Sequence, residues 1–279
     1  GPHENYLLDR GFHWGEWLRP GENDMDYVVL KVLLKIFGSS PVVATAYFAY
    51  SSKLLSSIAQ ELNFSDEECY YRTLSENVRK AWRAAFVQKG GKRIGEDKQD
   101  DYVRAIAFDL LSKSERQEAI TRLAELVREA GDHLGTGFLS TAMLLPVLAD
   151  NGHAELAYRI LMQTSMPSWL YQVERGATTT WDTWDGGYDS TGKGRHSHNH
   201  YALGSAMSWL QEGIAGMTPI SPGYRRIRFA PHIGGGLTFA KAALETPHGL
   251  ARSAWRIEGD EVVFEVCVPS GTTAQVHTP

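Results

Sequence analysis

The stretch PVVATAYFAYSSKLLSSIAQELNFSDEECYYRTLSENVRKAWRAAFVQKGG, residues 41–91, decides the fold of this chain. Apolar residues recur at helical spacing from Pro41, which suits the first turn of a helix, to Leu62. Ser65-Asp66-Glu67-Glu68 has the form of a capping box, and a second periodic run leads from it to Gly90-Gly91. The stretch therefore predicts an antiparallel helical hairpin.

The same pattern recurs further along the chain. We expect helices over residues 101–111, from a capping box at Ser112 to Gly131, and over 138–148, 154–162 and 198–215. Asn151-Gly152 separates two of these helices. Repeated antiparallel helix pairs predict a helical toroid that ends at about residue 217.

A run of prolines and glycine, Thr218-Pro219-Ile220-Ser221-Pro222-Gly223, closes the helical pattern. Four β-rich runs follow, over residues 226–229, 237–240, 254–257 and 262–266, and glycine-containing turns divide them. We therefore predict two domains, 1–217 and 218–279, of which the second is a small antiparallel β-sandwich.

Composition limits the class of protein. The chain has 279 residues, 43% hydrophobic residues and a formal net charge of −5, which gives no electrostatic reason to expect a nucleic acid or membrane partner. No apolar run reaches the roughly 18 residues needed to span a bilayer, and no cofactor motif is present. We expect a cytoplasmic protein. Cys69 and Cys267 lie far apart and are interpreted as buried thiols.

The stretch GATTTWDTWDG, residues 176–186, carries the clearest chemical signal, and SHNHY follows it at 197–201. Trp181 and Trp184 flank Asp182, and Asn199 and His200 lie a short way downstream. Indole rings stack on the C–H faces of sugars, while carboxylates and imidazoles bind hydroxyls and move protons. These five residues therefore predict a carbohydrate site in which Asp182 is the catalytic group.

Two neighbouring features have simpler interpretations. Asp185 before Gly186-Gly187 is typical of an Asx turn. The histidines at 196, 198 and 200 resemble a metal-binding tract, but no HExxH motif or Cys/His pair accompanies them. We therefore predict no metal site.

Two other segments could line the same site. Trp14 and Trp17 flank Glu16 in the stretch 11–18, which could form one wall of a sugar pocket or a structural turn that covers the helical core. His133 lies in a glycine-rich loop before a helix, where a histidine is more often structural than ligand-binding. We retain Trp14, Glu16, Trp17 and His133 as candidate substrate-binding residues.

With these residues the chain resembles the bacterial α-L-rhamnosidases, the inverting glycoside hydrolases of family 78. The matching pieces, in order, are His13 to Leu18, His133 to Thr141, Gly176 to Gly186, Asn199 to Gly204 and Ser221 to Thr238. The resemblance implies an (α/α)6 barrel followed by a β-sandwich, and cleavage of terminal α-L-rhamnose from glycosides or polysaccharides. A rhamnose-containing carbohydrate is thus the expected partner.

The resemblance also implies roles for two residues. Inversion needs one acid to protonate the leaving oxygen and one base to activate water, about 6.5 to 9.5 Å apart. The family's base aligns with Asp182, and a sugar-contacting histidine aligns with His200. Relatives commonly have Glu at the position of Asp182, and one methylene fewer withdraws the carboxylate by roughly 1.5 Å.

A second departure concerns the general acid. The family carries it in an Arg-Asp-Glu-Arg-type motif in the first half of the barrel, and these 279 residues contain no such motif. The expected helices also fall short of twelve, so the toroid is predicted to be partial. A fragment that lacks half the domain is the favoured explanation, and one piece of a complex or a shortened protein in which Glu16 or another acid has taken over remain alternatives. A half toroid would expose apolar faces, including Tyr27 to Phe37, which predicts self-association or a missing N-terminal half of the barrel.

Three functions therefore stay open. The favoured one is a rhamnosidase-type glycoside hydrolase. A non-catalytic carbohydrate-binding or assembly fragment would retain the tryptophans without the acid. An unrelated helical enzyme, such as a lyase or another toroid glycosidase acting on uronates, would use the same types of residue.

Overall fold

The computed structural model describes residues 5–11, 13–22, 40–187 and 197–278. The apolar stretch Tyr27 to Phe37 lies outside these residues. Within these residues the helices lie between 41 and 214 and all but two short strands follow them, so the fold is mainly α with a small β region. The helices are α2 (Pro41–Glu61), α3 (Ser65–Phe86), α4 (Gln99–Ala107), α5 (Lys113–Glu129), α6 (Thr141–Leu148), α7 (Ala154–Leu161), α8 (Trp169–Glu174) and α9 (Tyr201–Gly204).

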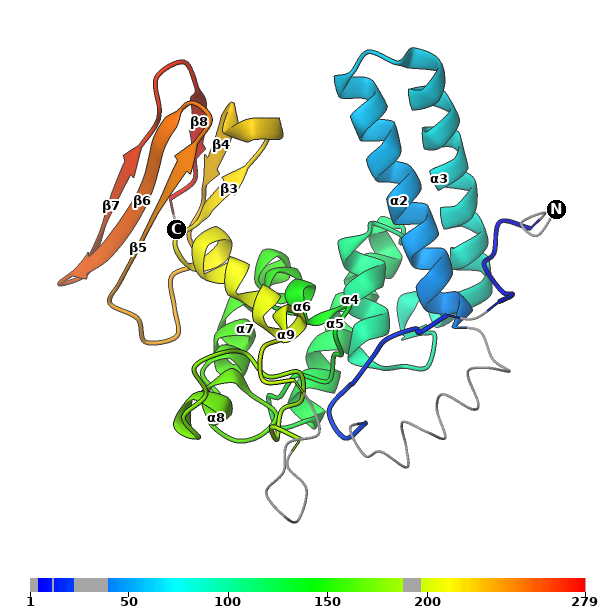
Figure 1. The fold of residues 1–279 in the computed structure, drawn as a ribbon, viewed down its shortest axis with the longest axis horizontal. Coiled ribbons are helices and arrows are strands. Elements are labelled where there is room, and N and C mark those ends of the chain that lie inside the picture. The colour runs from blue at the N-terminus through cyan, green and yellow to red at the C-terminus, as the bar shows by residue number, and fades with distance from the viewer. Residues whose placement is uncertain (1–4, 12, 23–39, 188–196, 279) are drawn as a thin grey trace.

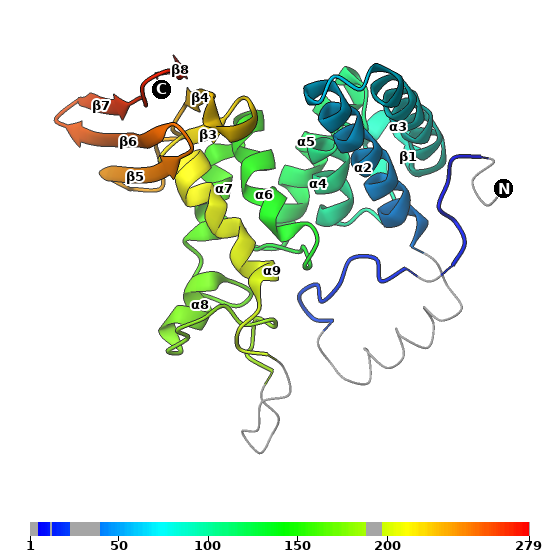
Figure 2. The same ribbon diagram turned by 45° about the horizontal axis from the view of Figure 1, so that its top comes forward.

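The helices form hairpins that follow one another in an arc (Figures 1 and 2). Helix α2 packs along α3, α4 along α5 and α6 along α7. The first helix of each hairpin also contacts the first helix of the next, since α2 contacts α4 and α4 contacts α6. Helix α6 contacts α9 as well. A two-stranded ribbon, β1 (Val87–Gln88) with β2 (Arg93–Ile94), links α3 to α4. This arrangement confirms the predicted hairpins.

Local sequence explains most helix boundaries. Ser112 caps α5 as predicted, because its hydroxyl accepts from the Glu115 amide while the Glu115 carboxylate accepts from the Ser112 amide. The capping box predicted at Ser65 is wrong, since α3 begins at Ser65 itself and has no side-chain cap. Three acidic residues, Asp66 to Glu68, instead place negative charge at the positive end of the helix dipole.

The helix predicted over 198–215 is present as a continuous helical segment over residues 201–214, but it is not α-helical throughout. The chain forms the short α9, a 3₁₀ turn at Ser205–Met207 and a π-helical turn at Leu210–Ile214. Glycine weakens helices, and this stretch contains Gly204 and Gly213. A side chain at Gly204 would meet the Thr180 hydroxyl at 2.8 Å, so this glycine permits close packing against the candidate site.

Two three-stranded sheets form the C-terminal region (Figure 1). Their strands are β3 (Met217–Pro219), β4 (Arg226–Phe229), β5 (Phe239–Thr246), β6 (Gly249–Glu258), β7 (Glu261–Cys267) and β8 (Thr273–Val276). Strands β5, β6 and β7 form an antiparallel meander, in which Trp255 pairs with Phe264. Strand β4 pairs antiparallel with β3 and parallel with β8, and the hairpin pattern did not predict this parallel pair. The boundary between residues 217 and 218 stays a prediction.

The helical core extends into the β5–β6–β7 sheet. Trp255 on β6 is 1% exposed and belongs to the same apolar cluster as the helices. Its indole donates to the Ile214 carbonyl at 2.7 Å, and the Ser253 hydroxyl donates to the Ala215 carbonyl. Trp209 packs edge-on against Tyr158 close to the contact between β6 and the last helical turn. The sheets are therefore anchored on the last helical turn.

The two cysteines are exposed, so the prediction of buried thiols is wrong. Cys69 lies in the first turns of α3, on the side away from the core, and Cys267 ends the edge strand β7. Within the described residues, no helix is long and apolar enough to cross a membrane.

We predict that Trp255→Phe lowers the free energy of unfolding by about 1–3 kcal/mol, because the Ile214 carbonyl loses its donor and the core loses volume. Urea denaturation followed by circular dichroism measures the change. Phe239→Leu on β5 is the control, since Phe239 is 63% exposed and its change should fall within about 0.5 kcal/mol. Equal stability of both variants would contradict the anchoring role of Trp255.

Candidate functional site

The N-terminal segment 13–22 lies across the N-terminal ends of α4 and α6. The Phe138 amide donates to the Trp17 carbonyl at 2.9 Å. A side chain at Gly137 would collide with that carbonyl, so glycine permits this close approach. The segment that carries Trp14, Glu16 and Trp17 is thus joined to the loop that follows His133.

Glu16 enters a buried ion network with Arg19, Glu22, Asp100, Asp101, Arg104 and Ser140. The network centres on Arg104 of α4, which is 1% exposed and forms ion pairs with Glu16, with Asp100 at 2.6 Å and with Asp101 at 3.1 Å. Ser140 donates to Glu16 through its amide at 3.1 Å and its hydroxyl at 2.9 Å.

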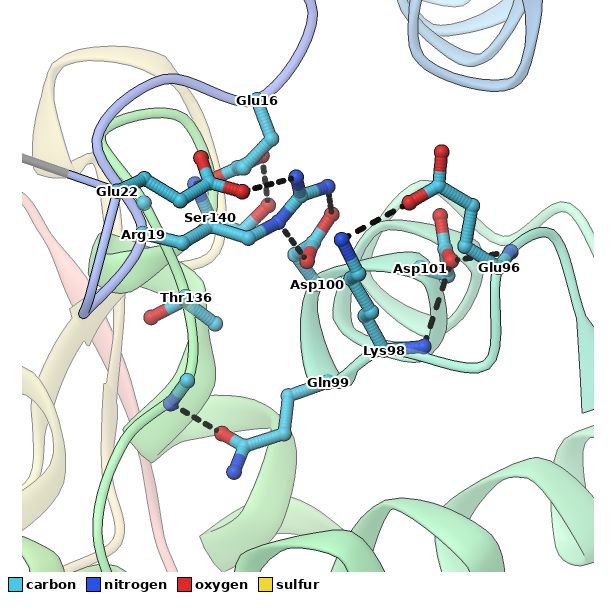
Figure 3. A network of polar contacts seen from close by, with 12 residues as sticks. Glu16, Arg19, Glu22, Glu96, Lys98, Gln99, Asp100, Asp101, Thr136 and Ser140 are labelled. Atoms are coloured by element: carbon cyan, nitrogen blue, oxygen red, sulfur yellow. Dashed lines mark hydrogen bonds and ion pairs between the residues drawn. The ribbon is translucent and has the colours of Figure 1, made fainter. Parts of the chain in front are cut away.

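Arg19 provides the second cation of the network. Its guanidinium donates to both oxygens of Asp100, at 2.8 and 3.0 Å, and pairs with Glu22 at 3.3 Å (Figure 3). A bidentate pair of this kind fixes geometry as well as charge. Two residues of the segment, Glu16 and Arg19, are therefore fastened to α4 by separate contacts.

Four carboxyl groups share these two guanidinium groups, so their pKa values diverge. Burial raises the pKa of Glu16, against the lowering effect of Arg104. Burial, with the neighbouring Asp100 carboxylate, raises the pKa of Asp101 to about 6. Burial also acts to raise the pKa of Asp100, but Arg104 and Arg19 outweigh it and hold that pKa below its usual value. Of Glu16, Asp100 and Asp101, Asp100 is thus the most firmly ionised.

This network gives Glu16 a structural position. Glu16 is 2% exposed, and both its carboxylate oxygens accept hydrogen bonds within the network. Its neighbours differ, since Trp14 is 55% exposed and packs edge-on against the half-buried Trp17. Of the three candidate residues in this segment, Trp14 is the most exposed.

Asp182 lies on a segment that runs beside the histidine stretch. The Asp182 amide donates to the Ser197 carbonyl at 3.1 Å, and the Ser197 amide donates to Oδ2 of Asp182 at 3.1 Å. The His200 amide donates to the Thr180 carbonyl at 2.9 Å. The structure thus brings Asp182 and the Asn199-His200 pair together, as the sequence predicted for one site.

His200 caps α9 with its side chain. Its Nδ1 accepts from the Ala202 amide at 3.2 Å, so the neutral ring carries its proton on Nε2. The ring stacks on Tyr201 and packs against Phe138, with centroids 5.4 and 4.5 Å apart. His200 therefore has a fixed orientation and an Nε2–H donor available for a hydroxyl group, while Asn199 beside it is exposed.

The indoles of Trp181 and Trp184 are buried, at 5% and 4% exposed. Trp181 stacks on His198 with centroids 4.9 Å apart, and Trp184 packs edge-on against Trp169. The sequence predicts that these rings form an exposed surface for stacking on sugars. In the structure they are buried instead, and they hold the Asp182 segment in place. Asp185 accepts from the Gly187 amide, as expected of an Asx turn.

Both ring nitrogens of His133 contact other groups of the protein. Its two ring nitrogens contact the Ala130 carbonyl at 3.1 Å and the Ser165 hydroxyl at 2.8 Å. The structural interpretation of this histidine therefore accounts for both nitrogens. The residues described include no group of three or more His, Cys, Asp or Glu side chains that could hold a metal ion.

A cavity of about 190 Å³ lies between the N-terminal segment and the residues that follow Asp182, and Trp184 is the one candidate site residue in its lining. One wall is Leu18 to Gly21 of the N-terminal segment, and the other comprises Met166, Pro167 and residues 183–185. The lining is mostly apolar, with Arg19 and Asp185 as its charged members. Such a lining suits the C–H face of a ring better than a fully hydrated polar group.

Sequence reasoning missed Arg104, Asp100 and Ser140. The signal for part of the network was present, because Asp100 and Asp101 precede Arg104 by four and three residues on one helix. Glu16 and Arg104 are 88 positions apart, and no local pattern relates them.

We predict that Asp101 makes stability fall as pH rises from about 4 to about 6. The folded protein holds the Asp101 proton more tightly than the unfolded chain, so this contribution is complete below pH 3.8 and lost as pH passes about 6. Asp101→Asn should remove this contribution, which is on the order of 1–3 kcal/mol. Urea unfolding at several pH values measures it.

Asp97→Asn is the control for this experiment. Burial acts to raise the pKa of Asp97, but hydrogen bonds from Arg122 and Tyr102 lower it overall, so its contribution has the opposite sign and is lost as pH falls. The two substitutions should change the pH slope in opposite directions. Parallel slopes for Asp101→Asn and the parent protein would contradict the assignment.

Comparisons with known proteins agree with this arrangement. Residues 3–214 match the bacterial alpha-L-rhamnosidase 6 hairpin glycosidase domain, and residues 213–279 match the bacterial alpha-L-rhamnosidase C-terminal domain. An alpha-L-rhamnosidase of Streptomyces avermitilis is 38% identical over 99% of this chain, and one of Formosa agariphila is 36% identical over 95%. The chain spans 26% and 28% of those two proteins, respectively.

Solved structures give the same result. The alpha-L-rhamnosidase of Streptomyces avermitilis complexed with L-rhamnose superposes with a TM-score of 0.85 and 36% identity, over 98% of this chain and 25% of that one. An alpha-L-rhamnosidase from Aspergillus terreus also gives 0.85, with 32% identity over 96% of this chain and 31% of that one. On both domain matches and on these relatives, the chain belongs to the bacterial alpha-L-rhamnosidase family.

Proposed function

We propose that this chain forms part of a glycoside hydrolase that releases terminal α-L-rhamnose with inversion, and that Asp182 is its general base. The observation that carries the proposal is the fixed Asp182 carboxylate beside the oriented ring of His200, in a chain of the rhamnosidase family. Support also comes from the rhamnose complex of the Streptomyces avermitilis relative.

In this mechanism the Asp182 carboxylate accepts a proton from water as the water attacks the anomeric carbon. The Ser197 amide donates to Oδ2 of Asp182, which helps to fix the orientation of the carboxylate. The Nε2–H of His200 would donate to a sugar hydroxyl and orient the ring. The leaving oxygen takes its proton from an acid on the opposite face of the sugar.

No Arg-Asp-Glu-Arg-type segment occurs in these 279 residues, and Glu16 is committed to Arg104 and Ser140. We therefore place the general acid on further hairpins of the six-hairpin domain. A non-catalytic carbohydrate-binding or assembly fragment is the second candidate function, and the lack of that acid motif is the observation that favours it.

We predict that Asp182→Asn lowers the rate of hydrolysis of 4-nitrophenyl α-L-rhamnoside by about 100-fold or more, because the amide cannot accept the proton from water. Release of 4-nitrophenol measures the rate. Asp260→Asn is the matched control, since Asp260 lies in the exposed turn between β6 and β7 and its substitution should leave the rate within about twofold.

The outcomes separate the two functions. Equal rates for the parent protein and Asp182→Asn would exclude Asp182 as the base. If the parent protein releases no nitrophenol, calorimetric titration with L-rhamnose decides between them. Binding without hydrolysis supports the non-catalytic function, and absence of binding rejects both for this chain alone.

An apolar stripe on α2 supports the proposal of further hairpins. The stripe consists of Leu54, Leu55, Ile58 and Leu62, which are 42–57% exposed and lie at helical spacing on one side. The family domain is described as having six hairpins, whereas the described residues form three hairpins and the pair α8 and α9. We propose that the stripe packs against the next hairpin of that domain and that, without it, two copies of this chain associate through it.

We predict that the double substitution Leu54→Lys, Ile58→Lys converts a self-associating chain into a monomer, because two charges in the stripe would lose hydration on association. Sedimentation velocity over a range of concentrations measures the change. Phe239→Lys, at a position 63% exposed on β5, should leave association unchanged. Undiminished association of the double variant would place the contact elsewhere.

A further inference from the structure

Helix α8 supports both segments of the candidate site. The Ser168 hydroxyl caps it by accepting from the Tyr171 amide at 3.1 Å. The Trp169 indole donates to the Leu203 carbonyl at 3.0 Å, and its ring packs edge-on against Trp184. A helix of six residues is thus attached to the chain on each side of the site.

Gln172 of α8 contacts the backbone on both sides of Asp182. Its Nε2 donates to the Thr183 carbonyl at 3.1 Å, and its Oε1 accepts from the Trp181 amide at 3.4 Å. Gln172 is 3% exposed, so water does not compete readily for these groups. A carboxamide can make both contacts because it carries a donor and an acceptor at its end.

These contacts fix the backbone at the residue whose carboxylate must be placed. Aspartate has one methylene between its Cα and its carboxyl group, so a shift of the backbone moves the carboxylate almost equally. Asp182 itself is bonded to Ser197 through its amide and through Oδ2. With Gln172 holding residues 181 and 183, the chain is restrained at three consecutive positions.

We propose that Gln172 is a positioning residue for Asp182: it sets the position of the carboxylate without touching substrate. This inference rests on the proposed role of Asp182 as the base. A carboxylate displaced by about 1 Å would lose on the order of 100-fold in rate, so the restraint matters for catalysis.

The Ser197 amide provides a direct signal of this geometry. Because it donates to Oδ2 of Asp182, its proton chemical shift should change as that carboxyl group titrates. Two-dimensional ¹⁵N–¹H spectra of the whole chain, recorded over a pH series, follow the amide. Asp182→Asn identifies the signal, because it should abolish the pH-dependent change.

We expect Gln172→Leu, which keeps the size of the side chain and removes both hydrogen bonds, to reduce that change by at least half. Gln172→Glu should give a smaller reduction, since an ionised carboxylate can still accept from the Trp181 amide but cannot donate to the Thr183 carbonyl. The second variant preserves a test if the first fails to fold.

Gln163→Leu is the matched control. The Gln163 amide also donates to backbone carbonyls, of Gly131 at 3.1 Å and Asp132 at 3.4 Å, but in another loop. This variant should retain the full change of the Ser197 signal. An unaltered Ser197 titration in both Gln172 variants would overturn the proposal.

Turnover separates this inference from the proposed function. Where the chain hydrolyses 4-nitrophenyl α-L-rhamnoside, Gln172→Leu should lower kcat by about 10- to 100-fold with KM within about twofold. Where it does not, the proposed function fails for this chain alone, and the Ser197 signal still decides whether Gln172 positions Asp182.

Discussion

The position of the N-terminal segment against α4 and α6 depends on the buried guanidinium of Arg104. It pairs with Glu16 of the incoming segment and with Asp100 and Asp101 of its own helix, and Glu16 in turn accepts from Ser140 before α6. Removing one partner of a buried ion pair leaves an uncompensated charge, which typically costs about 3–5 kcal/mol. The segment, α4 and α6 therefore cannot separate without that penalty.

A different kind of contact holds Asp182 and His200 in place. Backbone hydrogen bonds join residues 180–182 to 197–200, and buried aromatic rings pack beneath them. Asp182 and His200 are thereby placed by the backbone, while Trp14 remains exposed on the facing segment. The chain segments next to these two sets of contacts line one cavity, since Leu18 to Gly21 and residues 183–185 both border it.

The helical hairpins could be predicted from sequence because their signals are local. Each signal acts within a few residues: capping at Ser112, apolar periodicity, and the break at Asn151-Gly152. The structure has the capped helix at Ser112 and non-helical backbone angles at Asn151 and Gly152. The change from α-helix to 3₁₀ and π-helical turns within residues 201–214 could not be predicted in this way. Gly204 packs against Thr180 and Gly213 against Trp209, and the first of these contacts depends on how distant segments meet. The parallel pairing of β4 with β8 is likewise non-local.

For the site, sequence predicted which residue types occur but not which of them face a ligand. Trp181 and Glu16 each belong to a cluster of aromatic and acidic residues in the sequence, which is typical of a sugar site. Both side chains are buried, however, and stabilise the segments that carry them. An inverting site needs two carboxyl groups on opposite faces of the sugar, about 6.5 to 9.5 Å apart. In the proposed mechanism Glu16 does not supply the acid opposite Asp182, because it is bound within the ion network. Helix α2, which carries the exposed stripe, belongs to the hairpin at one end of the arc (Figure 2), and the proposed next hairpin of the six-hairpin domain would cover that stripe.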